Sequence, residues 1–186
     1  LPMALWRIPA VTLIAFGLMW LGAGVFNLPW HSSIRMARYQ EEVQSHISAM
    51  DYMTASSVTN DWLALYPFDW RAYFQRAKLV LSNSGDQEAA AADFMRARFV
   101  EPILGVVSYE EGIAWLPINS GRVIAAWRET LLRGMENIDS TFDSMLEQAA
   151  SREMREKMAR LSEINPHFRT RYICSLKGEK LVGEIS

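Results

Sequence analysis

The chain opens with a long hydrophobic run and continues as segments in which hydrophobic residues recur at helical spacing. From Ile8 to Trp30 no residue carries a fixed charge, and this length covers the roughly 20 residues that a transmembrane helix needs. Trp6 and Trp30 stand at the two edges of the run, where aromatic residues anchor helices in the membrane interface. We therefore expect residues 1–30 to form a transmembrane anchor in contact with the lipid bilayer.

Two other interpretations of this run stay open. In a signal peptide, Arg7 would supply the basic region and residues 22–24 (Gly-Ala-Gly) the small-residue cleavage site. The run could instead be a helix buried in a protein core. Its length, with bulky Trp20 and Phe26 on either side of that cleavage site, favours the anchor.

The flanking charges bear on orientation. Arg35 and Arg38 follow the hydrophobic run, whereas Arg7 alone precedes it. Because positive residues are retained on the cytoplasmic side, the difference of one charge leans toward a cytoplasmic position for residues 31–186. We expect this second part to form one helical domain.

Residues 31–186 carry the pattern of an all-α protein. Alternation of polar and apolar residues is rare, and strong helix formers recur with a period near 3.6. Residues 181–185 fit either a helix or a strand, and we favour a helix. The pattern predicts helices over residues 34–50, 53–65, 70–81, 87–100, 107–115, 121–133, 138–150, 151–164, 167–175 and from residue 180 onward.

Residues 67–102 are expected to form a helical hairpin. Asp69 caps its first helix, and Gly85 lies in the short turn, where a positive φ is available to glycine. Residues 87–100 form its second helix, which Pro102 closes. The distance from Pro67 to Pro102 is about 35 residues, near the period of several helical repeats.

This hairpin resembles a tetratricopeptide repeat, in which aromatic residues fill the groove between two helices and small residues let the helices approach. The resemblance implies an α-solenoid of stacked antiparallel helix pairs after the transmembrane helix. Lys78 departs from the pattern, because that position in the first helix is usually small. The positions that match the packing pattern are Phe74, Ala77, Leu81, Gly85, Ala90, Phe94, Ala97 and Pro102.

The same resemblance implies a ligand site. Repeat solenoids bind peptides in a concave groove, and Tyr73, Arg76 and Lys78 on the first repeat helix are the candidates to line it. The partner is then expected to be a protein or a peptide.

Composition narrows the function classes. The 186 residues carry a net charge of -2 and no concentrated basic stretch, which argues against nucleic acid as a partner. Cys174 is the single cysteine, so it forms no internal disulfide, and we interpret it as a half-buried structural residue.

The sequence offers no catalytic, cofactor or metal site. His31, His46 and His167 are far apart, with no HExxH motif. Glu110 and Glu111 are adjacent, and neighbours on a helix point about 100° apart. We therefore interpret the two glutamates as a solvated helix start and not as a catalytic pair.

Two further patterns have structural interpretations. Residues 152–160 alternate in charge at helical spacing, which predicts a solvated face with salt bridges, or alternatively a partner-binding ridge. Four large side chains at helical spacing are expected in the core: Trp115, Trp127, Phe142 and Met145.

The whole arrangement resembles the C-terminal end of a bacterial O-antigen ligase or polymerase-type membrane protein. The resemblance rests on residues 6–9 (Trp-Arg-Ile-Pro), 69–73 (Asp-Trp-Arg-Ala-Tyr), 93–97 (Asp-Phe-Met-Arg-Ala) and 126–129 (Ala-Trp-Arg-Glu). It implies a bacterial cell membrane location and an accessory role in cell-envelope glycan assembly. In that family the sugar transfer belongs to a membrane part that would precede Leu1, so no catalytic residue is carried over. The start at Leu1 favours this origin, and the alternative is a stand-alone single-span scaffold that recruits a protein.

Overall fold

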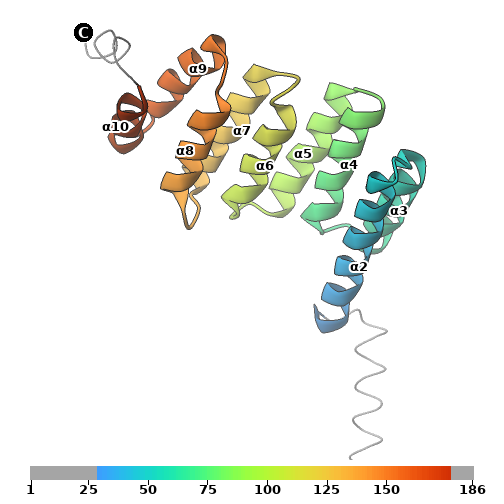
Figure 1. Ribbon diagram of the computed structural model, residues 1–186. Helices are drawn as coiled ribbons and strands as arrows, with labels where there is room; N and C mark the ends of the chain where they lie inside the picture. The colour runs from blue at the N-terminus through green and yellow to red at the C-terminus, as the bar shows by residue number, and fades with distance from the viewer. Residues whose placement is uncertain (1–28, 177–186) are drawn as a thin grey trace, which may run out of the picture. The chain divides into compact units, whose positions relative to one another are not determined.

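The described part of the chain is entirely helical. The structure, a computed structural model, describes residues 29–176, with side chains from residue 33 onward. Within these residues there is no strand, which confirms the all-α prediction (Figure 1). The helices are α2 (Pro29–Ser48), α3 (Tyr52–Leu65), α4 (Trp70–Asn83), α5 (Gln87–Val100), α6 (Gly105–Trp115), α7 (Ser120–Arg133), α8 (Ile138–Gln148), α9 (Arg152–Ser162) and α10 (Pro166–Ser175).

The expected transmembrane helix lies almost wholly outside the described residues. Among the helices from α2 to α10, none combines the length and the hydropathy needed to cross a bilayer. The expected last helix, from residue 180, also lies outside the described residues. α2 runs through the expected domain boundary at residue 30.

The chain divides into two compact units between Pro67 and Phe68. The first unit contains the helix pair α2 and α3, with Tyr39 stacked on Trp62 at a centroid distance of 6.1 Å. The carboxylate of Asp51 caps α3 by accepting a hydrogen bond from the backbone N–H of Thr54. α2 begins at Pro29 and not near residue 34 as predicted, because proline lacks the N–H that a first helical turn leaves unbonded.

The second unit consists of two closely packed helix pairs, α4 with α5 and α6 with α7, followed by α8, α9 and α10. α4 packs antiparallel to α5, and α6 packs antiparallel to α7. α9 contacts α7, and α10 contacts both α8 and α9. Local polar side chains fix where most of these helices begin, because each accepts hydrogen bonds from the first backbone N–H groups. These capping residues are Asp69, Asp86, Asn119, Ser151 and Asn165.

Corresponding core positions of α4, α6 and α8 recur about 34 residues apart. One set is Phe74, Ser108 and Phe142, and another is Ala77, Glu111 and Met145; every member of both sets is buried. The four side chains expected in the core, Trp115, Trp127, Phe142 and Met145, are each 0% exposed, which confirms that prediction.

Candidate functional site

The residues predicted to pack the hairpin of α4 and α5 lie together. Phe74 and Phe94 meet edge to face, with their ring centroids 5.2 Å apart. Close approach of the two helices is possible because the positions around these rings carry small side chains. The other predicted residues in or beside this core are Ala77, Ala90 and Ala97, which are fully buried, and Leu81, which is partly buried.

The two remaining positions of this set lie in the turns. Gly85 connects α4 to α5 with a φ of 68°, a conformation that costs residues with a Cβ free energy. Pro102 follows the end of α5 and is exposed.

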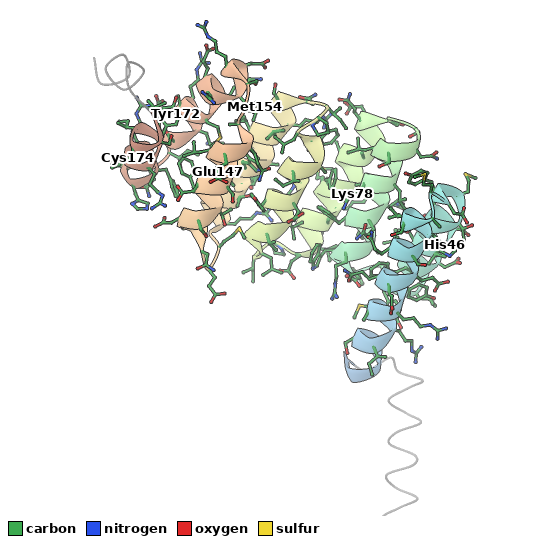
Figure 2. The ribbon with its side chains drawn as sticks, viewed as in Figure 1. His46, Lys78, Glu147, Met154, Tyr172 and Cys174 are labelled. Carbon is green, nitrogen blue, oxygen red and sulfur yellow. The ribbon has the colours of Figure 1, made fainter. Side chains whose placement is uncertain are left out.

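The structure gives different surroundings to the three predicted groove residues. Arg76 forms a two-point ion pair with Asp93 of α5, with Nε–Oδ2 at 2.7 Å and Nη2–Oδ1 at 2.8 Å, and these hydrogen bonds raise the pKa of Arg76. Its guanidinium also lies over the ring of Tyr73 at 5.6 Å. Lys78 is exposed, labelled in Figure 2, with Nζ 5.9 Å from the ring of Phe74. Arg76 therefore joins α4 to α5, and the binding role of the three residues stays a prediction.

Glu111 is a buried charge that the sequence interpretation placed wrongly. It lies in the middle of α6 and is only 5% exposed, not at a solvated helix start. Its Oε2 lies 3.3 Å from Nη1 of Arg98, and its Oε1 accepts a hydrogen bond from Nε1 of Trp115. Burial raises the pKa of Glu111, and the nearby arginines offset part of this effect. Its alignment with Ala77 and Met145 is the sequence signal that marks it as a core position.

A pocket of about 600 Å³ opens between α8, α9 and α10. Apolar groups line much of it, and Met158, Ala149 and Tyr172 among them are buried. The pocket lies where the close packing of consecutive helices ends. α8 and α9 approach each other less closely than α4 and α5 do, with the large side chains of Phe142 and Met145 in the core beside them. The polar residues that line the pocket include Asp143, Glu147, Arg155 and Ser175.

Some of the charged side chains around this pocket form ion pairs within the chain, and others do not. Arg171 binds Asp143 through both carboxylate oxygens, and this pairing raises the pKa of Arg171. The exposed carboxylate of Glu147, labelled in Figure 2, has no ionic partner in residues 33–176. Arg155 donates from Nε to the backbone oxygen of Ala149 and pairs with no carboxylate in that range. The pocket thus combines an apolar floor with one unpaired charge of each sign.

The described residues hold no group of three or more His, Cys, Asp and Glu side chains placed to bind a metal ion. His167 instead pairs with Asp139, with Nε2–Oδ1 at 2.7 Å. Cys174 is exposed on α10 and not half-buried as expected, because it lies outside the face that carries Phe168 and Tyr172 into the core. The arrangement can bind and orient another molecule through apolar contact and charge.

Comparison with known proteins adds no relative. No family model matches the chain, and the searches of curated proteins and of solved structures returned no match.

Proposed function

We propose that residues 31–186 form a tetratricopeptide-like helical-repeat module that binds a protein or peptide partner. The observation that carries the proposal is the pocket between α8, α9 and α10, the three helices that follow the helix pairs α4–α5 and α6–α7. Its volume of about 600 Å³ accommodates more than one side chain of a peptide. Glu147 and Arg155 supply charges that select and orient such a segment.

A tether to a bacterial cell membrane through residues 1–30 is part of the proposal. It is supported by the uncharged run from Ile8 to Trp30 and by the tryptophans at its edges. With the second resemblance described above, this makes the module an accessory region of a cell-envelope glycan ligase or polymerase. A single-span scaffold that recruits a partner at the membrane is the second candidate.

Site-specific photocrosslinking tests the binding function. A benzoylphenylalanine at position 147, on the pocket, is expected to crosslink to a discrete partner in membranes that contain the full chain. The same group at position 152, whose arginine side chain is 93% exposed and does not line the pocket, serves as the control. Ser175→Trp fills the pocket and is expected to abolish the crosslink. Thr170→Trp, on an exposed position of the same helix, is expected to leave it unchanged.

The outcomes distinguish binding of a partner in the pocket from nonspecific crosslinking. A crosslink at position 147 that survives Ser175→Trp, or that forms equally from position 152, removes the pocket as the binding site. The choice between accessory region and scaffold is tested by reading the gene upstream of the Leu1 codon. Many further hydrophobic spans there support the glycan enzyme, and a start codon within a few codons supports the scaffold.

A further inference from the structure

A second recess lies between α7 and α9, away from the residues that line the pocket described above. It has a volume of about 340 Å³. Its apolar lining comes from Ile124, Leu161 and Ile164, of which Ile164 is 36% exposed. Leu132 follows Arg128 by one turn of α7 and is 55% exposed. The recess thus offers an apolar surface and enough volume to receive a side chain of a partner.

All charged residues that line this recess are basic: Arg128, Lys157 and Arg160. Arg128 and Arg160 are exposed, and neither has a carboxylate within ion-pair distance among residues 33–176. Lys157 donates hydrogen bonds to Glu153 and to the hydroxyl of Ser120, each at 2.6 Å. Two guanidinium groups therefore remain available beside an apolar surface.

We infer that this recess, named here the α7–α9 groove, binds a peptide segment in which acidic residues flank an apolar side chain. A carboxylate fits the planar guanidinium group through two parallel hydrogen bonds, so Arg128 and Arg160 each match one acidic residue. The apolar side chain between them packs against Ile124 and Leu161. The chain already uses the same chemistry internally, where Arg76 binds Asp93 through two contacts.

The charges around the groove favour a peptide over other anionic partners. Exposed Glu153 and Glu156 lie on α9 together with Lys157 and Arg160, and exposed Glu163 follows the end of this helix. A planar anionic bilayer or a nucleic acid backbone would bring many negative charges against these glutamates. A short peptide places its carboxylates at Arg128 and Arg160 alone. This inference goes beyond the proposed function, because it concerns another surface and specifies the chemistry of its ligand.

Peptide selection on the full chain tests the inference. A phage library of random short peptides is expected to yield sequences with Asp or Glu on both sides of an apolar residue. Synthetic peptides of that type, measured by fluorescence anisotropy, are expected to bind at least about tenfold more weakly to Arg128→Glu/Arg160→Glu. Arg128→Gln/Arg160→Gln is a milder variant with the same expected direction, and circular dichroism verifies that both variants fold. Arg152→Glu, which changes an exposed arginine of α9 outside the groove, is expected to bind as the parent does.

Each alternative result overturns the inference. Charge recognition at this groove is excluded if the selected peptides lack acidic residues or if both double variants bind with unchanged affinity. It is also excluded if peptides with Asn and Gln in place of Asp and Glu bind equally well. Binding to phosphatidylglycerol vesicles that depends on Arg128 and Arg160, with no peptide selected, would make the surface a lipid site. Ser175→Trp, which fills the pocket between α8, α9 and α10, is expected to leave acidic-peptide binding unchanged. This variant therefore distinguishes binding at that pocket from binding at the α7–α9 groove.

Discussion

The indole ring of Trp127 on α7 lies directly against the backbone of Gly112 on α6. A Cβ at position 112 would overlap the Nε1 and Cδ1 atoms of the ring. Both residues are buried, so neither the ring nor the helix has free space in which to move. The absence of a side chain at position 112 is therefore what allows α6 and α7 to pack closely around a large aromatic residue.

Replacing Gly112 with Ala is expected to destabilise the fold despite the higher helix propensity of alanine. The added methyl group displaces Trp127 or separates the two helices, at a cost of about 1–3 kcal/mol. Urea unfolding followed by circular dichroism measures the loss. Gly121→Ala is the matched control, because the nearest atom to a Cβ there is Oδ1 of Asn119 at 3.3 Å. Equal stability of the Gly112→Ala variant and the parent would contradict the packing argument.

The ion pair between Arg76 and Asp93 is expected to contribute to stability. Asp93 is 4% exposed, so removal of its two-point partner leaves a buried carboxylate partly unpaired. Arg76→Ala is expected to lower the free energy of unfolding by about 1.5–3 kcal/mol. Arg96 binds the same carboxylate at 2.6 Å, but its side chain is 54% exposed. Arg96→Ala is therefore expected to cost less than about 1 kcal/mol.

Thermal unfolding of both arginine variants measures this difference. If the two variants lose equal stability, the buried contact of Arg76 with Asp93 stabilises the fold no more than the exposed contact of Arg96 does. If Arg76→Ala is as stable as the parent, the ion pair between Arg76 and Asp93 does not contribute to stability.

Substitutions of Gly85 test how much the backbone conformation of the turn between α4 and α5 contributes to stability. Its φ of 68° lies in the left-handed region, and no atom lies within 4 Å of an added Cβ. Gly85→Ala is therefore expected to lose about 1 kcal/mol through backbone strain alone. Gly85→Asn is expected to lose less, because asparagine adopts this conformation more readily. The melting temperatures of the two variants measure the effect, and equal losses would show that the backbone conformation does not set the cost.

Glu111 is expected to make stability depend on pH. Because burial raises its pKa in the folded chain, the folded state holds the proton of Glu111 more tightly than the unfolded state does. Its contribution is fully present below the unfolded pKa of about 4.3 and is lost as pH rises through the higher folded pKa. Glu111→Gln is therefore expected to raise the melting temperature more at about pH 7 than at about pH 4.

Glu110→Gln is the matched control for this measurement, since Glu110 is the exposed neighbour on the same helix. A pH dependence that is the same in the Glu111→Gln variant and in the parent would mean that another group causes it.

Much of the local structure follows from the sequence. The helix of residues 87–100 begins and ends where predicted, and Asp69 caps α4 as expected. Gly85 provides the positive φ of the turn. The salt bridges predicted for residues 152–160 are present, because Arg152 pairs with Glu156 and Lys157 pairs with Glu153. These features depend on hydrogen bonds and charges within a few residues along the chain, so the sequence contains the information that they need.

Tertiary structure alone decided the partners of the charged residues and the positions of the two recesses. Arg76 could be assigned to a binding groove from its sequence position, but Asp93 of the next helix binds it. Glu111 lies in the core because that face of α6 packs toward α5 and α7. The pocket and the α7–α9 groove depend on how closely helices far apart in the chain approach. The sequence by itself determined where helices form, and the fit between their side chains decided what remains open to a partner.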